Sequence, residues 1–464
     1  MHRRVRPGRR PRTRRLVAAV AALTAVAVGA SCTPGSPTQG SETPRQPRSA
    51  VSTDPSKAGK VTLTVWDQEV RGSQNVAMTN LNNEFMKKYP NITIKRVAKS
   101  FTDLKTTLKL ALSDDNPPDV VQANQGYPDM GTFVDAGMLQ RLDPYANAYG
   151  WRKRYSKTLL DLNSFTPNGK QFGQGYLYGI SQTGEIVGVY YNKKKLAALG
   201  LAQPKTWGEF TKQLATIKSK GELPIMFGNK DAFPAIHTYG MIQNRTNPQQ
   251  EIVDTVFTRP GKKWDTTGNE NAAATMQDWV EKGYFSEGAN GLGYDQAAAD
   301  FANGKGVFLM TGTWLYADLA KTMKKDLGFM PPPPVKAGGV PYATGGQGLS
   351  WSITSRSEHS DVAGAYLDFI TSPHAADVVT KAGGLPAIAP ESAKPEAGTA
   401  LAQIFTEWTR LNDANGLVPY LDYTTPNFYD TLSVQLQRLI GEKATPQQCI
   451  GEMQKDYGDF QAHK

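Results

Sequence analysis

One stretch of the sequence places a large aromatic residue at a position where an open sheet can bind ligands. Residues 300–316 read DFANGKGVFLMTGTWLY: the end of a helix, a Gly-Lys-Gly turn, an apolar strand and then Trp314. In an open α/β sheet, ligands bind outside the carboxyl ends of the strands. Trp314 therefore offers a flat surface for a ligand, although a tryptophan in this pattern also suits core packing.

Two polar residues follow other predicted strands at the same kind of edge. Glu69 comes after the strand VTLTVW at 61–66, and Asn124 comes directly after DVVQA at 119–123. A carboxylate accepts hydrogen bonds, and an amide both donates and accepts them. We therefore expect a polar and aromatic binding site at the ends of these strands.

The order of the predicted elements indicates an α/β fold with more than one lobe. Strands at 61–66, 92–97 and 119–123 alternate with helices of apolar periodicity, which predicts a largely parallel, doubly wound sheet. Glycines within 173–192 permit a bend and a change of sheet. Capping boxes at Thr206, Thr267 and Thr445 predict the starts of three helices. A chain of 464 residues also exceeds one typical domain.

The positive charge belongs to the N-terminus and gives no argument for nucleic-acid binding. Eight arginines precede the first acidic residue, Glu42, so removal of residues 1–31 lowers the formal charge from +10 to +2. The apolar run at 16–30 is too short for an ordinary membrane span and suits a signal-peptide core. We therefore expect residues 1–31 to be a signal peptide.

The residues after this run predict a lipid anchor and a tether. VGASC at 28–32 resembles a bacterial lipobox, in which Cys32 would carry the lipid and become the mature N-terminus. Residues 32–59 are rich in Pro, Ser, Thr and Gly, so we expect a disordered tether with the folded part starting near Lys60. The second cysteine, Cys449, then has no intramolecular partner and suits a small buried helix residue.

Four motifs in order carry a resemblance to a known family. They are VTLTVW at 61–66, NPPDVVQAN at 116–124, EIVGVYYNKKKL at 185–196 with TWGEF at 206–210, and FANGKGVFLMTGTW at 301–314. Together they resemble the family 1 extracellular solute-binding proteins, the maltose-binding-protein-like receptors of bacterial ABC sugar importers. The resemblance covers residues 60–464. It implies an α/β, two-lobed periplasmic-binding-protein-like fold with a hinge and a central cleft.

The resemblance also implies which residues of this chain form each lobe. Lobe one would contain residues 60–180 and 307–356, and lobe two would contain residues 183–305 and 358–464. The chain would cross between the lobes near 179–184, 305–307 and 355–357.

The resemblance also implies further site residues. Trp314 lies where such receptors place a stacking aromatic residue, and Phe233 with Asp231 matches another such position. Glu185 stands seven residues before Asn192, at the spacing of a ligand-contacting glutamate. A late aromatic wall of the site is implied for the segment YLDYTTPNFYD, which contains Asp422, Tyr423 and Phe428.

The function implied is capture of a sugar or oligosaccharide and its delivery to ABC permease subunits. We expect a monomer anchored through lipid at the extracellular face of the cell membrane, with no nucleic-acid partner, cofactor, metal or catalytic residue. The sequence contains no Walker loop, G-x-S-x-G elbow or HExxH motif, and its histidines lack metal-ligand spacing. The alternatives are a secreted glycoside hydrolase and a binding protein for a peptide or polyamine.

Overall fold

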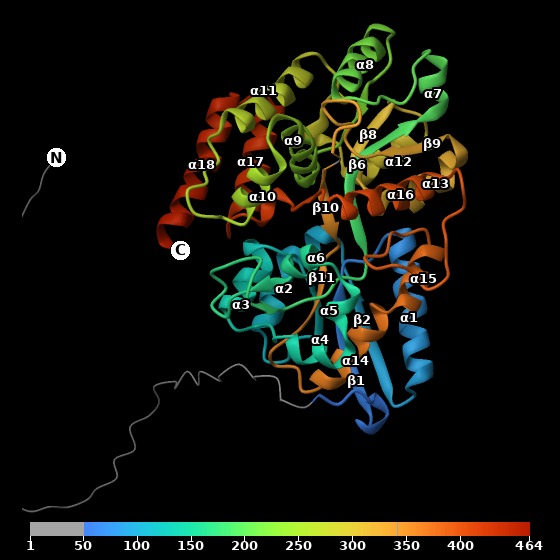
Figure 1. Cartoon of the computed structure of the whole chain (residues 1–464), viewed down its shortest axis with the longest axis vertical. Coiled ribbons are helices and arrows are strands. Elements are labelled where there is room, and N and C mark those ends of the chain that lie inside the picture. Colours follow the sequence, from blue (N-terminus) through green and yellow to red (C-terminus); the bar gives the residue numbers. More distant parts are fainter. Residues whose placement is uncertain (1–50, 341) are drawn as a thin grey trace, which may run out of the picture. The chain divides into compact units, whose positions relative to one another are not determined.

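Two large β-sheets, each with its own helices, and a small two-stranded sheet make up the part of the chain that the structure describes (Figure 1). The structure is a computed structural model, and it describes residues 51–340 and 342–464. The expected signal peptide, Cys32 and residues 33–50 of the expected tether lie outside the described residues.

The first sheet has the order β11-β3-β1-β2. Its strands are β1 (Val61–Asp67), β2 (Ile92–Ala98), β3 (Val120–Ala123) and β11 (Ser350–Ile353). Strands β1, β2 and β3 are parallel, as their alternation with helices predicts, and β11 runs antiparallel to β3. Alternate residues of β1, Val61, Leu63 and Val65, are buried because successive side chains of a strand point to opposite faces.

Eight helices and a short hairpin accompany this sheet in lobe one. They are α1 (Gly72–Lys88), α2 (Phe101–Ser113), α3 (Thr132–Asp135), α4 (Asp143–Tyr149), α5 (Trp151–Arg154), α6 (Lys157–Asp161), α14 (Ser360–Ile370), α15 (Pro373–Lys381), and the strands β4 (Ser164–Phe165) and β5 (Tyr176–Leu177). Helices α14 and α15 pack against α1, far from them in sequence.

The second sheet has the order β12-β10-β6-β8-β7, with β9 also paired to β6. Its strands are β6 (Gly184–Asn192), β7 (Ile225–Met226), β8 (Phe308–Gly312), β9 (Leu327–Met330), β10 (Ala343–Gln347) and β12 (Leu417–Val418). Strand β6 is buried along its whole length and runs antiparallel to β8, β9 and β10. This lobe therefore does not have the largely parallel sheet that the sequence analysis predicts.

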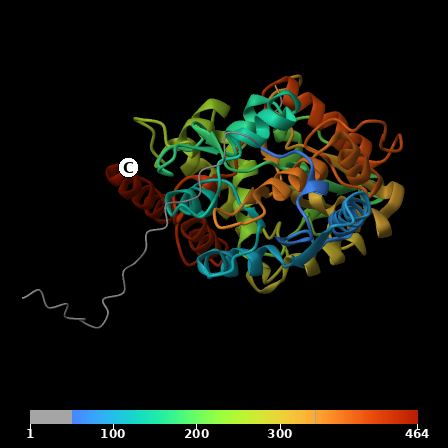
Figure 2. The same cartoon turned by 90° about the horizontal axis from the view of Figure 1, so that it is seen from below.

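Ten helices surround the second sheet. They are α7 (Lys193–Ala198), α8 (Trp207–Ser219), α9 (Phe233–Thr246), α10 (Gln249–Val256), α11 (Thr267–Glu281), α12 (Tyr294–Ala302), α13 (Tyr316–Met323), α16 (Ala400–Asp413), α17 (Phe428–Ile440) and α18 (Pro446–His463). Helices α17 and α18 pack against each other, and α18 (dark red) leads to the marked C-terminus at one edge of the view in Figure 2.

The helix starts mostly follow the predicted capping residues. The Thr206 side chain accepts a hydrogen bond from the Glu209 amide at the start of α8, and Thr445 forms a complete capping box at α18. At α11 the prediction is wrong by one residue, because Thr266 rather than Thr267 is the N-cap. Cys449 is buried in α18, as expected.

The strand pairing corrects the expected lobe boundaries. Strand β8, expected in lobe one, pairs with β6 over Val187–Tyr191, and β9 and β10 join the same sheet. Helices α14 and α15, expected in lobe two, pack in lobe one. Lobe one is therefore formed by residues 51–180 and 350–382, and lobe two by residues 184–347 and 400–464.

The chain crosses between the lobes at three segments that are hydrogen-bonded together. The crossing at 181–183 agrees with the expectation, whereas the other two lie at 348–349 and 383–399 rather than at 305–307 and 355–357. The Gly348 amide donates to the Thr183 carbonyl at 3.0 Å, and the Gly184 amide donates to the Leu385 carbonyl at 2.8 Å. The first crossing thus contacts both of the others.

Residues 51–59 belong to the folded part, which corrects the expected end of the tether. A short 3-10 helix at Pro55–Lys57 is capped by Asp54. The Asn91 side chain donates to the carbonyls of Pro55 (2.9 Å) and Gly59 (2.7 Å). These contacts attach the segment to lobe one ahead of β1.

Candidate ligand-binding site

A cavity lies between the two lobes, and side chains of both lobes line it. Its volume is about 660 Å³, open solvent at the mouth included. The lining residues are Gln68, Arg71, Gln74, Phe101, Asn124, Glu185, Phe233, Ile236, His237, Trp314, Gln347, Leu349, Tyr420, Asp422, Tyr423 and Tyr429. The composition of the lining is typical of a small-molecule site, with aromatic walls and a few polar groups.

Six of the nine predicted binding residues meet at this cavity. They are Asn124, Glu185, Phe233, Trp314, Asp422 and Tyr423. They come from β6, from α9, from the segments that directly follow β3 and β8, and from the segment before α17, so the fold collects them from positions far apart in the sequence.

The other three predicted residues have different surroundings. Phe428 is 0 % exposed, and its ring lies 4.6 Å from that of Trp264 in the core of lobe two, so its prediction as a cavity residue is wrong. The Asp231 carboxylate accepts from the Tyr294 amide at 2.8 Å, where it caps α12 instead of facing the cavity. Glu69 lies behind the wall, 2 % exposed, next to the lining residue Gln68.

Trp314 lies in a single turn that directly follows β8. Its ring folds back over Gly312, where a Cβ atom would lie only 1.9 Å from the indole. The indole N–H donates to the Tyr294 hydroxyl at 2.6 Å, and that hydroxyl also shares a 2.6 Å hydrogen bond with Thr311. The small residue in the motif TGTW thus makes room for the ring, and α12 fixes its orientation.

Aromatic rings from both lobes continue the wall around Trp314. The His237 ring lies 5.3 Å from the Trp314 ring and 5.6 Å from that of Phe233. Phe101 of lobe one lies 5.9 Å from Phe233 and 6.3 Å from Tyr429, both of lobe two. The cavity therefore offers several flat apolar surfaces at angles to one another.

Two buried carboxyl groups face the same cavity. Burial raises the pKa of Glu185 from its ordinary value of 4.5 to about 7, and the Tyr420 hydroxyl donates to this carboxyl at 2.8 Å. Burial likewise raises the pKa of Asp422 to about 6, although Lys105 opposes the shift. Neither carboxyl forms an ion pair among the described residues, so both can accept hydrogen bonds from a ligand.

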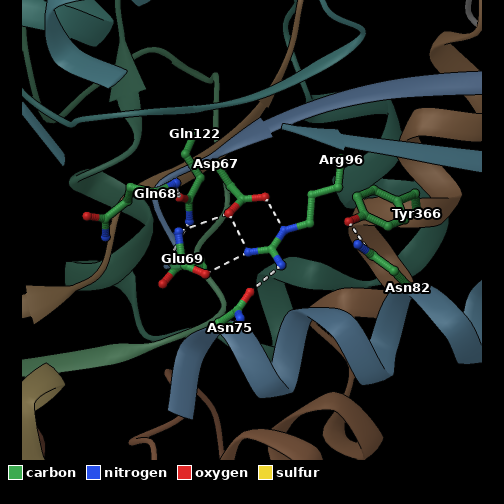
Figure 3. A network of polar contacts seen from close by, with 8 residues as sticks. All are labelled: Asp67, Gln68, Glu69, Asn75, Asn82, Arg96, Gln122 and Tyr366. Carbon is green, nitrogen blue, oxygen red and sulfur yellow. Dashed lines mark hydrogen bonds and ion pairs between the residues drawn. The ribbon is translucent and has the colours of Figure 1, made fainter. Parts of the chain in front are cut away.

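A buried ion pair holds the polar segment that follows β1 (Figure 3). The Arg96 guanidinium donates from Nε and Nη2 to both oxygens of Asp67, each at 2.7 Å, and from Nη2 to the Glu69 carbonyl, also at 2.7 Å. Its third nitrogen donates to the Asn75 side chain at 2.8 Å. This geometry fixes the backbone at Glu69 because one planar group bonds both the strand end and the next turn.

Gln122 of β3 completes this network on the side of the cavity. Its carbonyl oxygen accepts from the Gln68 amide at 2.8 Å, and its Nε2 donates to the Glu69 carboxyl at 2.6 Å (Figure 3). Burial raises the pKa of Glu69 to about 7. Gln122 therefore links the Glu69 carboxyl to the backbone of the lining residue Gln68.

The two lobes are in contact at the edges of the cavity. The Arg71 guanidinium of lobe one bonds Asp295 of lobe two at 2.8 Å. The Tyr423 hydroxyl donates to Gln125 at 3.1 Å, and at Gly126 (φ +79°) a Cβ atom would lie 2.3 Å from that of Tyr423. These contacts join the two lobes beside the cavity.

Ten lining residues were missed by the sequence analysis, although some had local signals. Ile236 and His237 follow Phe233 by three and four residues, so they share its face of α9. Tyr429 stands beside Phe428, so the predicted aromatic residue was displaced by one position. Arg71, Phe101 and Gln347 carry no local signal, because only the tertiary fold brings them to the cavity.

The bacterial extracellular solute-binding protein family matches residues 71–377, more than half of the chain. The chain belongs to this family. This solute-binding protein is 26% identical over 333 residues to the multiple sugar-binding protein of Streptococcus mutans serotype c, covering 69% of this chain and 73% of that protein.

Solved structures of solute-binding proteins share the two-lobed α/β fold. A chitin oligosaccharide binding protein superposes with a TM-score of 0.74 at 22% identity, covering 87% of this chain and 99% of that chain. RafE in complex with raffinose superposes with a TM-score of 0.69 at 20% identity, covering 86% of this chain and 100% of that chain. The predicted fold class is therefore confirmed.

The described residues contain neither a cluster suited to a metal ion nor a helix that could span a membrane. Within 51–340 and 342–464, no group of three or more His, Cys, Asp or Glu side chains is arranged to hold a metal ion. In the same part of this solute-binding protein, no helix has the length and apolar character needed to cross a membrane.

Replacement of Arg96 should destabilise the protein far more than loss of an exposed ion pair. Arg96→Met leaves the Asp67 carboxylate, 0 % exposed, without its counter-ion, and we expect a loss of about 3–5 kcal/mol in unfolding free energy. Arg152→Met, which breaks the exposed pair with Asp143, should cost less than about 1 kcal/mol. Urea unfolding measures both, and equal losses would contradict a central role for the Asp67–Arg96 pair.

Replacement of Glu185 should stabilise the empty protein in a pH-dependent way. Because the folded pKa is raised, the folded state keeps a proton that the unfolded state loses between pH 4.5 and about 7, so stability falls as pH rises through this window. Glu185→Gln removes this pH-dependent loss of unfolding free energy, which is up to about 3 kcal/mol.

The variant should therefore exceed the parent in unfolding free energy at pH 8 and match it near pH 4. Urea unfolding at both pH values makes the comparison. The control Glu281→Gln, at the exposed end of α11, should show no such pH-dependent gain. A Glu185→Gln gain that is the same at both pH values would show that the carboxyl is not the cause.

Proposed function

We propose that this protein is the extracellular receptor of an ABC importer and encloses a mono- or oligosaccharide between its two lobes. The observation that carries the proposal is the interlobe cavity, in which aromatic rings stand beside carboxyl and amide groups. A sugar has flat C–H faces that stack on rings and a belt of hydroxyls that hydrogen-bond to such polar groups. The sugar names carried by the similar proteins support the same ligand class.

Each lining residue has a role in this proposal. Trp314 and Phe233 provide stacking surfaces, and Tyr423, in the segment before α17, completes the aromatic wall. Glu185 and Asp422 accept hydrogen bonds from hydroxyls, and the Asn124 amide both accepts and donates. Rotation at the three crossings then opens and closes the cavity, and the sugar is released unchanged to the permease.

The alternative ligand classes fit the cavity less well. A polyamine site should be dominated by carboxylates, whereas this cavity also contains four amide side chains and the Arg71 guanidinium, which repels a polycation. A glycoside hydrolase would need an acid and a second carboxyl placed across a scissile bond. The matching family consists of binding proteins, which favours binding without turnover.

A thermal-shift screen tests the proposal. The mature protein is heated with raffinose, stachyose, xylotriose, N,N′-diacetylchitobiose, galactose, a peptide mixture and spermidine. A sugar that binds the folded state should raise the melting temperature, by mass action. Chromatography of the incubated sugars checks that they remain intact. Stabilisation by peptides or spermidine alone, or cleavage of a sugar, would contradict the proposal.

Truncation of Trp314 should weaken sugar binding. Trp314→Ala removes a large rigid surface from the cavity, so we expect at least a tenfold loss of affinity, about 1.4 kcal/mol, by titration calorimetry. Phe428→Ala is the control: this core residue should cost about 3–5 kcal/mol of stability but leave the affinity of the folded fraction unchanged. Unchanged affinity in Trp314→Ala would remove this residue from the proposed site.

We also propose that lipid on Cys32 anchors the receptor at the extracellular face of the membrane. The support is the lipobox-like sequence ahead of a chain of an extracellular family. Cys32→Ala should release the protein into the medium or leave it uncleaved, as cell fractionation and mass spectrometry would show. Cys449→Ala should remain anchored. A Cys32→Ala protein that stays on the membrane at the mature size contradicts the anchor.

A further inference from the structure

Two polar atoms of residues that line the cavity have no hydrogen-bond partner among the described residues. They are Nδ1 of His237 and Oε1 of Gln347, and both atoms are buried. Folded proteins pair most of their buried polar atoms, because an unpaired one lowers the stability of the fold. Two such atoms at one cavity indicate that a bound molecule supplies the missing partners.

The free atom of Gln347 must be a hydrogen-bond acceptor. Its Nε2 donates to the Leu159 carbonyl at 2.6 Å, and a carbonyl can only accept. The amide nitrogen must therefore face Leu159, which leaves the amide oxygen free at the end of β10. The side chain is 2 % exposed, so bulk water does not replace the missing donor.

The free atom of His237 belongs to an uncharged ring. The rings of Phe233, Trp314 and Tyr420 surround it at centroid distances of 5.6, 5.3 and 5.6 Å. No carboxylate of the residues that the structure describes bonds the imidazole, and burial lowers its pKa to about 3, so the ring is neutral at physiological pH. A neutral imidazole has one N–H and one lone pair. It can therefore donate to or accept from a hydroxyl.

We propose that His237 and Gln347 contact the ligand directly and decide which hydroxyl pattern the cavity accepts. This inference rests on the proposed sugar-binding function and adds two residues to it. A hydroxyl can donate to the Gln347 oxygen and can pair with either tautomer of His237, whereas an apolar group leaves both atoms unpaired. Sites built to bond a hydroxyl strongly reject analogues that lack it, because buried polar groups then remain unpaired.

Replacement of His237 separates this role from packing. His237→Phe keeps a ring among the three aromatic neighbours and removes the nitrogen atoms. Using the sugar of the screen that binds the wild type most tightly, we expect at least a tenfold loss of affinity by calorimetry. The melting temperature of the empty protein should be unchanged or higher, because an unpaired polar atom has been removed.

The neighbouring residue on α9 provides a matched control. The Thr238 hydroxyl is also buried and unpaired, but Thr238 does not line the cavity. Thr238→Val should therefore leave the affinity unchanged. Gln347→Leu should lower both affinity and stability, since it also removes the donor to Leu159.

Monodeoxy derivatives of the same sugar identify the contact. For one derivative, the affinity of the wild type should fall to the affinity that His237→Phe has for the parent sugar. His237→Phe should bind this derivative and the parent sugar with equal affinity. Should His237→Phe not fold, His237→Leu takes its place. The inference is overturned if the His237 variant binds the sugar with wild-type affinity. It is also overturned if every derivative loses the same affinity in both proteins. In either case the proposed function stands. A wild type that binds no sugar overturns both.

Discussion

The joint between the lobes depends on hydrogen bonds among its three crossing segments. Within the joint, the Ala387 amide donates to the Gln182 carbonyl at 2.9 Å. Directly beside it in lobe one, Ile180 exchanges two backbone hydrogen bonds with Trp351, at 3.0 and 2.8 Å. The backbone at the joint is thus paired even though neither sheet passes through it. Site residues lie beside these segments: Glu185 follows the first crossing, and Gln347 precedes the second.

The cavity gathers groups that a core optimised only for stability would avoid. Buried carboxyls with raised pKa values and unpaired polar atoms each lower the stability of the empty protein. The surrounding scaffold compensates with well-paired groups such as Asp67 and Arg96 and with two extensive apolar clusters. A binding site that lowers folding stability inside a scaffold that raises it is expected where function needs strained or unsatisfied groups.

Local sequence patterns predicted much of lobe one and the cavity residues Trp314 and Asn124, and the family resemblance implied four more cavity residues. The strands at Val61–Asp67 and Ile92–Ala98 and the capping of α8 follow from periodicity and side-chain chemistry, which are local. The lobe boundaries do not follow from local patterns, because the sequence of a strand such as β8 does not indicate which sheet the strand joins. Phe428 was predicted to line the cavity, whereas its neighbour Tyr429 does so. The cause is similar, since the rotation of a helix about its axis depends on its tertiary neighbours.

The discontinuity of both lobes has a consequence for the order of folding during synthesis. Lobe one lacks β11, α14 and α15 until residue 381 has been made, and lobe two lacks β12 and helices α16 to α18 until the chain is almost finished. Neither hydrophobic cluster is complete in a nascent chain, because both contain residues beyond 400. The chain should therefore remain incompletely folded while the ribosome extends it.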